Sequence, residues 1–297
     1  MAANLFRLVR WGLTRGPTEL ELAARTARPR LQTIAFSHYC ELARWALDAR
    51  GIDYDEVSHL PGFGFRVAAL RGDAHLATSS FPGEAQGMPA AKRRRTGVPA
   101  LAMPDGAVLR DSWEIADFAS SAASAAPPPA DAAWRAYLDA EFAPAVRLVA
   151  YHHLLGSAAF AHIVGALGAP HERAAYALAG DAVVRSMRKT MGVDARAAEA
   201  ATATVRDGFA RAADVLPARD SAPSTDEMAF AAFSAIMLAP PEYGGARWCV
   251  VDAQGGRTSR MLPPREQMPG ALRELQEELS DTAAGKRALA LYANHRL

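Results

Sequence analysis

The pattern of apolar and polar positions changes abruptly near residue 37. Residues 31–36, LQTIAF, form a short apolar run that predicts a strand. Apolar residues then recur at three- and four-residue spacing, at Leu42, Trp45, Ala46 and Ala49. This spacing predicts a helix that ends at Gly51. The next segment, IDYDEV, alternates apolar and acidic residues as a half-buried strand does, so residues 31–57 predict a βαβ unit with two parallel strands.

Residues 98–122 predict the second half of the same module. VPALAMPDGAVL has two short apolar runs on either side of Asp105-Gly106, a pair that hairpin turns favour because both residue types tolerate positive φ. RDSWEIADFASSA follows with helical spacing, and Asp111 or Ser112 can cap its first turn. Residues 61–96, rich in Gly, Pro and Ser, predict a long irregular connection. The predicted order is therefore βαβ, connection, ββα.

A proline-rich segment, AAPPPAD at residues 125–131, predicts a domain boundary, because three consecutive prolines cannot continue a helix. Beyond it the pattern predicts only helices, at residues 131–155, 171–191, 194–215, 225–238 and 268–294, the last interrupted near Gly285. We expect three parts: an N-terminal extension at 1–30, an α/β domain at 31–124 and an all-helical domain at 131–297. Within the extension, residues 1–16 have the spacing of an amphipathic helix.

Composition narrows the classes of function. The 297 residues are 50% hydrophobic and 22% charged with a formal net charge of +1, which is typical of a folded two-domain protein and argues against a nucleic-acid binder. The 2 cysteines are too few for a disulfide framework and favour a reducing, cytoplasmic location. No stretch approaches the roughly 20 consecutive apolar residues of a membrane span. Arginine far outnumbers lysine and alanine is abundant, which suggests a bacterial, GC-rich genome.

Four motifs together resemble the cytosolic glutathione transferase family, and the resemblance covers residues 31–297. They are SHYCELARWAL after the first strand, GVPAL before the third, DSWEIADF after the fourth, and PSTDEMAFAAFSA in the helical half. The resemblance implies a thioredoxin-like N-terminal domain followed by an all-α domain. The last motif resembles the family's buried capping box, with Ser224 and Glu227 bonded reciprocally. The connection 61–96 is longer than the family's usual one.

Ser37 is the first candidate for chemistry. The thiol of glutathione has an ordinary pKa of about 8.5, so only a few per cent is thiolate at neutral pH. A hydroxyl at a helix N-terminus lowers that pKa, because it donates a hydrogen bond to the anion where unpaired N–H groups also favour negative charge. Ser37 stands where the family's serine-type members keep this hydroxyl. Without the resemblance, a serine before a helix is an ordinary N-cap.

Cys40 is the alternative group. Thiol-type members of the family carry their cysteine at the position of Ser37, and Cys40 matches the second position of their C-x-x-C pair. Without a first cysteine there is no dithiol cycle. Cys40 is then either a structural cysteine within the helix or, if exposed, a monothiol with a lowered pKa.

The resemblance assigns glutathione contacts to two further motifs. The backbone of Val98 would pair with the cysteinyl part of glutathione as an added strand does, beside a cis Pro99. From base rates alone this bond is trans, because only about 5–6% of X–Pro bonds are cis. Asp111 and Ser112 would hold the γ-glutamyl end, with the serine on the carboxylate and the acid near the ammonium. The same pair also fits an ordinary helix cap.

Other polar residues have weaker assignments. His38, Tyr39 and Tyr151 either border the pocket for a second substrate or pack at the helix entry and between domains. The basic run at 92–95 either contacts a carboxylate or an acidic partner, or is solvated. Arg44 is expected in a structural ion pair. His152, His153 and His162 do not share one helix face, so we expect no metal site.

These features predict a homodimeric glutathione transferase that adds glutathione, its only cofactor-like substrate, to a small hydrophobic electrophile. The intact site motifs favour this enzyme. The long connection 61–96 and the extra N-terminal segment favour a non-catalytic glutathione-fold binding protein instead. Glutathione-dependent thiol reduction through Cys40 is a third hypothesis.

Overall fold

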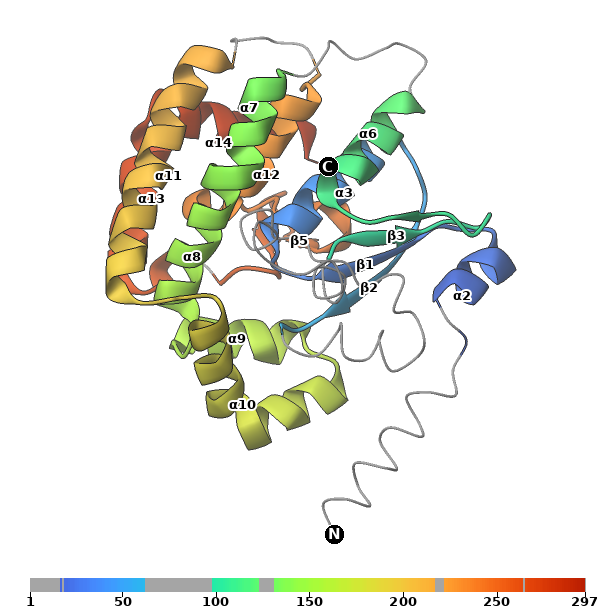
Figure 1. Cartoon of the computed structure of the whole chain (residues 1–297), viewed down its shortest axis with the longest axis horizontal. Helices are drawn as coiled ribbons and strands as arrows, with labels where there is room; N and C mark the ends of the chain where they lie inside the picture. Colours follow the sequence, from blue (N-terminus) through green and yellow to red (C-terminus); the bar gives the residue numbers. More distant parts are fainter. Residues whose placement is uncertain are drawn as a thin grey trace, which may run out of the picture.

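A four-stranded sheet with its own helices lies beside a larger group of helices in the computed structural model (Figure 1). The structure describes residue 17 and residues 19–61, 98–122, 131–216, 222–263 and 265–296. Three predicted features lie outside the described residues: the amphipathic segment 1–16, nearly all of the connection 61–96, and its basic run at 92–95.

The sheet has the strand order β2-β1-β3-β4. Its strands are β1 (Arg30–Ile34), β2 (Asp55–His59), β3 (Ala100–Ala102) and β4 (Val108–Leu109). β1 and β2 are parallel, with Leu31 opposite Glu56, as the βαβ pattern predicts. β3 runs antiparallel to both of its neighbours, β1 and β4.

The turn between β3 and β4 is the predicted hairpin. The Met103 amide donates to the Ala107 carbonyl at 2.8 Å. Gly106 takes a φ of 89°, whereas Asp105 uses its carboxylate to accept from the Ala107 amide at 3.0 Å. Of the Asp-Gly pair, only the glycine needs the left-handed region.

Two helices of this domain lie on the same side of the sheet and pack on each other: α3 (His38–Ala49) and α6 (Ser112–Ser121) (Figure 1). The first ten residues of α3, His38 to Leu47, are all buried. This follows from the position of α3, which contacts α6 on one side and α12 of the helical half on another. A helix enclosed in this way contributes to both cores.

The N-terminal extension contains a helix that the sequence pattern did not predict, α2 (Glu19–Thr26). Ala23 is fully buried beside Ala102 of β3. Glu19 accepts a hydrogen bond from the Arg30 guanidinium at 2.5 Å. The chain therefore begins to pack on the sheet before the domain boundary expected at residue 31.

The second half is mostly helical, as predicted. It contains α7 (Ala132–Tyr137), a π-helical turn η2 (Leu138–Phe142), α8 (Ala143–Leu154), α9 (Ala158–Leu167), α10 (Pro170–Thr190), α11 (Ala195–Val215), α12 (Thr225–Leu238), α13 (Gly270–Asp281) and α14 (Ala283–His295), with short 3-10 turns at Gly245–Arg247 and Arg265–Gln267. α9 was not predicted. The last break lies at Thr282, whose hydroxyl accepts from the Gly285 amide at 3.0 Å, rather than at Gly285 itself.

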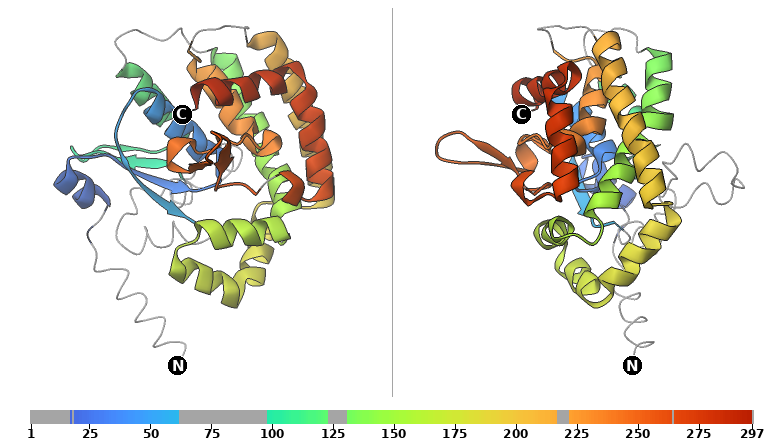
Figure 2. Two further views of the ribbon diagram at one scale, coloured as in Figure 1. Left: turned by 180° about the vertical axis from the view of Figure 1, so that it is seen from behind. Right: turned by 90° about the vertical axis from the view of Figure 1, so that its left-hand side faces the viewer.

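The prediction of helices alone was wrong at residues 249–259. β5 (Cys249–Val251) and β6 (Arg257–Ser259) form an antiparallel hairpin that projects from the body (Figure 2). Its turn contains Gly255 with a φ of 83°. The β-branched pair in CVV and the glycines of DAQGG are the sequence signals for this hairpin.

α12 forms the centre of the helical half. Every residue from Glu227 to Leu238 is buried, because α3, α8, α13 and α14 surround the helix. Its start is the predicted capping box: the Ser224 amide donates to Glu227 at 2.8 Å and the Glu227 amide donates to the Ser224 hydroxyl at 3.3 Å. Glu227 also pairs with Arg287 of α14, which fixes the two helices together.

Among the described helices, no single one is long and apolar enough to cross a membrane. Only the bent pair Ala132–Leu154 and Ala158–Leu167, taken together, meets that test by length and composition. The described residues also contain no group of three or more His, Cys, Asp or Glu side chains suited to a metal ion.

Candidate active site

Three segments that are far apart in the chain meet at one end of the strands, which we call the site edge of the sheet: β1 and β4 finish there and β3 starts there. β1 runs towards this edge and leads to Ser37. β3 starts at the same edge, after Val98-Pro99, because it is antiparallel to β1. β4 is antiparallel to β3, so it returns to this edge and leads to Asp111. The βαβ-ββα order therefore brings the three predicted site segments together.

Ser37 is the N-cap residue of α3, but its side chain makes no capping hydrogen bond. Its backbone is held on both sides: its amide donates to the Ile34 carbonyl at 3.0 Å, and its carbonyl accepts from the Glu41 amide at 3.0 Å. The residue is half-buried. The hydroxyl at the positive end of α3 is therefore not used by the cap, although it hydrogen-bonds with the Cys40 side chain.

Cys40 lies inside α3 and is 0% exposed. Its Sγ accepts a hydrogen bond from the Ile34 amide at 3.4 Å. Burial raises the pKa of the Cys40 thiol to about 11, and the Arg44 guanidinium, the Ile34 amide and a hydrogen bond with the Ser37 side chain offset only part of that rise. At neutral pH the thiol is protonated and out of contact with solvent, which is the environment of a structural cysteine.

The Val98–Pro99 peptide bond is cis, which is the isomer that the resemblance implies and not the one that base rates favour. Pro99 is buried and Val98 is half-buried directly before β3. The backbone of Val98 therefore lies just before the start of β3, a central strand. Because β3 is antiparallel to β1, this is the end of the sheet where β1 leads to Ser37.

Asp111 and Ser112 begin α6. Asp111 is the N-cap, and its carboxylate accepts from the Glu114 amide at 2.8 Å. Glu114 reaches back to accept from the Arg110 amide at 2.6 Å, so the start of α6 is tightly held. Asp111 is exposed, whereas Ser112 is only 2% exposed. Both stand at a helix N-terminus, where backbone N–H groups have no partner within the helix.

His38 and Tyr39 are buried between the two halves of the chain. They are 2% and 5% exposed, and their rings pack on Phe233 of α12 with centroid distances of 5.7 and 5.3 Å. Tyr151 of α8 is 9% exposed. Burial raises the pKa of both tyrosines, so their hydroxyls stay protonated at neutral pH. The aromatic rings of His38 and Tyr39 thus lie between the start of α3 and α12.

Two residues near the site were not identified from the sequence, Asp139 and Arg147. Burial and the Asp111 carboxylate raise the pKa of Asp139, although Trp113 and Arg135 act in the opposite direction. The positive charge of Arg147 affects the pKa of His38, Tyr39 and Tyr151. The available signal was spacing, because Asp139, Arg147 and Tyr151 recur at multiples of four along one continuous helical segment.

The titration of His38 leads to a pH prediction. Burial, together with the charge of Arg147, lowers the pKa of His38 from 6.5 to about 3. Unfolded His38 takes up a proton near pH 6.5, whereas the folded residue stays neutral down to about pH 3, so its contribution to stability is complete above pH 6.5 and decreases as the pH falls. Each pH unit in this window costs about 1.4 kcal/mol.

We therefore expect the wild-type protein to lose about 2 kcal/mol more unfolding free energy than His38→Asn when the pH falls from about 7.5 to about 5. Urea unfolding at the two pH values measures this difference. Equal losses for the two proteins would show that His38 is not held neutral in the folded state.

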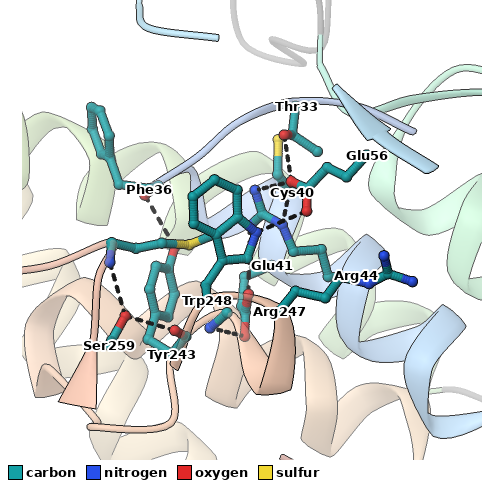
Figure 3. Close-up of polar contacts among 12 residues, drawn as sticks. Thr33, Phe36, Cys40, Glu41, Arg44, Glu56, Tyr243, Arg247, Trp248 and Ser259 are labelled. Carbon is teal, nitrogen blue, oxygen red and sulfur yellow. Dashed lines mark hydrogen bonds and ion pairs between the residues drawn. The ribbon is translucent and has the colours of Figure 1, made fainter. Parts of the chain in front are cut away.

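Buried charged side chains attach α3 to its neighbours (Figure 3). Arg44 forms the expected ion pair: its Nε donates to Glu56 at 2.8 Å. Glu56 also accepts from the Thr33 hydroxyl at 2.6 Å and from the Trp248 indole at 2.8 Å. Burial alone would raise the pKa of Glu56, but the charge of Arg44 and these hydrogen bonds lower it. The network joins α3 to β2 and to the helical half.

Comparisons with known proteins agree with this architecture. Residues 31–128 match the family described as glutathione S-transferase, N-terminal domain. A glutathione S-transferase of Ceriporiopsis subvermispora, solved in complex with glutathione, is 15% identical, with a TM-score of 0.52 over 91% of this chain and 98% of that chain. A glutathione transferase of Phanerochaete chrysosporium is 14% identical, with a TM-score of 0.52 over 91% of this chain and 98% of that chain. The comparison with curated proteins found no match.

At these identities the solved structures establish the fold, while the family match is specific to the N-terminal domain that carries the three site segments. The four-stranded sheet and the helical second half of this chain are the parts that this likeness in fold covers. Residues 31–128 are thus similar to the glutathione S-transferase N-terminal domain, and the chain as a whole has the fold of the glutathione transferases it resembles.

Proposed function

We propose that this protein activates the thiol of glutathione for attack on a hydrophobic electrophile. One observation supports this most directly. The Ser37 hydroxyl stands at the N-terminus of α3 and is not used as a cap, at the same sheet edge as Val98-Pro99 and Asp111-Ser112. An ordinary N-cap serine would bond to the first turn of its own helix.

The proposed reaction begins with loss of the thiol proton to solvent. The Ser37 hydroxyl donates a hydrogen bond to the resulting thiolate, and the end of α3 adds its partial positive charge. The sulfur electron pair then forms a carbon–sulfur bond with the electrophile. The displaced electron pair leaves with the departing group, or moves to the acceptor atom when the electrophile is an activated double bond. Atoms and electrons balance without any oxidant.

The other segments would bind the peptide part of glutathione. The Val98 backbone pairs with the cysteinyl unit, and Ser112 with the start of α6 receives the γ-glutamyl carboxylate. Asp111 receives the ammonium group. Asp139 lies close enough to Asp111 for the Asp111 carboxylate to raise its pKa, and it adds negative charge at this end. A cation placed beside both carboxylates would relieve their repulsion.

The electrophile would lie between the two halves of the chain. Tyr151, Tyr39 and His38 lie in this region; they are buried, and all three are uncharged at neutral pH. An apolar acceptor is therefore favoured. We further propose that the protein acts as a homodimer, as its family resemblance implies.

The proposal is tested on the wild-type protein. We expect retention on immobilised glutathione and conjugation of glutathione to an aryl halide. Retention without conjugation would instead identify a non-catalytic glutathione-binding protein. Mass spectrometry after exposure to oxidised glutathione tests the third hypothesis, since a mixed disulfide at Cys40 would indicate thiol reduction.

Ser112→Ala should weaken glutathione binding more than it weakens the fold. The hydroxyl is proposed to bond to a carboxylate, and loss of a hydrogen bond to a charged group costs about 1.5 kcal/mol, roughly a tenfold increase in Kd. Calorimetric titration with glutathione measures the change, and thermal unfolding serves as the control for the fold. Unchanged affinity in a well-folded variant would remove Ser112 from the site.

A further inference from the structure

The turn that carries Ser37 is held by a residue that follows it by about two hundred positions. The Tyr243 hydroxyl donates a hydrogen bond to the Phe36 carbonyl at 3.0 Å (Figure 3). Tyr243 is 0% exposed. Water cannot replace a partner that is buried. The Tyr243 hydroxyl, from the helical half, therefore satisfies the Phe36 carbonyl.

The bond acts on the peptide unit between Phe36 and Ser37. This unit is planar, so fixing both of its polar groups fixes its orientation. Its carbonyl accepts from Tyr243 at 3.0 Å, and its amide, that of Ser37, donates to the Ile34 carbonyl at 3.0 Å. The direction of the Ser37 side chain therefore depends on an anchor on each side of the plane.

Tyr243 is itself held firmly. Its carbonyl accepts from the Ser259 hydroxyl at 2.7 Å, and Ser259 accepts in turn from the Met261 amide at 3.1 Å (Figure 3). The next residue, Gly244, donates its amide to the Glu41 carboxylate at 3.1 Å. Two adjacent residues of one loop thus bond to the chain on both sides of Ser37: Tyr243 to Phe36 before it, and Gly244 to Glu41 of α3 after it.

Glu41 completes the attachment. Its backbone amide makes the first helical hydrogen bond of α3, to the Ser37 carbonyl. Its buried carboxylate accepts from the Arg296 guanidinium at 2.8 Å as well as from Gly244. The carbonyl before Ser37 and the first turn after it are therefore both fastened to the C-terminal half.

We propose that Tyr243 is a positioning residue for glutathione activation: its hydroxyl orients the Phe36–Ser37 peptide so that the Ser37 hydroxyl meets the thiolate. This inference rests on the proposed role of Ser37. Hydrogen bonds weaken steeply when their geometry departs from linear, so a small rotation of this peptide reduces the stabilisation of the thiolate. It also means that thiol chemistry in the first domain depends on the loop after α12.

The test is Tyr243→Phe, which removes the hydroxyl and keeps the ring. The matched control is Tyr292→Phe, because Tyr292 is also 0% exposed and its hydroxyl reaches Glu41 only at 3.5 Å, the limit of a hydrogen bond. The first measurement is the pKa of the enzyme-bound glutathione thiol, monitored through the ultraviolet absorbance of the thiolate. We expect Tyr243→Phe to raise it by about half a unit, a roughly threefold loss of thiolate, with little change in KM.

The second measurement is amide hydrogen exchange without glutathione. Tyr243→Phe should exchange faster than Tyr292→Phe at Ser37 and Glu41. Ser259→Ala, which keeps the Tyr243 hydroxyl but removes the bond to its carbonyl, should change both measurements in the same direction by a smaller factor. This variant carries the test if Tyr243→Phe does not fold.

The possible failures are distinguishable. If wild-type protein leaves the pKa of the glutathione thiol at its free value, the proposed function is wrong and the inference with it. If the wild-type protein lowers that pKa and Ser37→Ala restores it, while Tyr243→Phe behaves like Tyr292→Phe, the function stands and the inference is overturned.

Discussion

Ser37→Ala should slow glutathione conjugation by about 10–100-fold, which corresponds to about 1.4–2.7 kcal/mol of lost thiolate stabilisation. The reason is local. The hydroxyl at the N-terminus of α3 makes no capping bond, so its removal costs the helix little and the thiolate much. The pH–rate profile with an aryl halide acceptor should shift to higher pH, because the bound thiol regains a pKa closer to that of free glutathione.

Cys40→Ser is the control for this prediction. The Cys40 thiol is 0% exposed and its pKa is raised to about 11, so we expect the pH–rate profile to stay nearly unchanged. The opposite pair of results, with activity that survives Ser37→Ala but not Cys40→Ser, would reverse the assignment. A dominant glutathione adduct at Cys40 would then make the protein a thiol-dependent oxidoreductase.

Arg296→Met should lower the free energy of unfolding by about 3–5 kcal/mol, since it leaves the Glu41 carboxylate buried without its main counter-charge. Arg296 is fully buried near the end of the chain, where it donates to Glu41 at 2.8 Å and to Asp48 at 2.8 Å. A side chain at Gly245 would come within 2.2 Å of its guanidinium, so this part of the core is shaped around the arginine. Urea unfolding at neutral pH measures the loss.

Arg206→Met is the matched control. Arg206 forms two hydrogen bonds to Glu278, at 2.6 and 2.7 Å, but the two side chains are 53% and 46% exposed. Such surface pairs contribute about 0–1 kcal/mol. Adding Glu41→Gln to Arg296→Met should recover part of the loss, because it neutralises the buried carboxylate that has kept only Arg44, at 3.5 Å, as a counter-charge. Equal effects of the two arginine substitutions would show that the burial of Arg296 contributes no special stabilisation.

The elements that the sequence predicted well are those with regular local patterns. The βαβ unit, the Asp105-Gly106 hairpin and the Ser224 capping box each depend on residues only a few positions apart. The β5–β6 hairpin was missed because its strands are only three residues each and lie among helical segments. Helix α2 was missed because it is short and packs on the sheet through a small apolar face, Ala23 with the partly buried Leu20.

The candidate site was predictable in part for the same reason. Ser37, Val98-Pro99 and Asp111-Ser112 each follow or precede a strand, and the strand order brings them to one edge. Their roles stay predictions until the substitutions above are measured. Asp139 and Arg147 were not predicted, because their closeness to the site depends on how the helical half packs against α3 and α6.

The sequence by itself determined the order of elements in the βαβ-ββα module, the capping box of α12 and the positions that begin α3 and α6, because these features depend on side-chain periodicity and on hydrogen bonds within one turn. Only the tertiary structure decided which charges and thiols are buried. Cys40 has an ordinary helix position, and its raised pKa comes from the helices packed over it. Glu41 and Arg296 are 255 residues apart, as Phe36 and Tyr243 are 207 apart. No local pattern encodes such pairs, since desolvation and long-range hydrogen bonds arise only when the two halves close on each other.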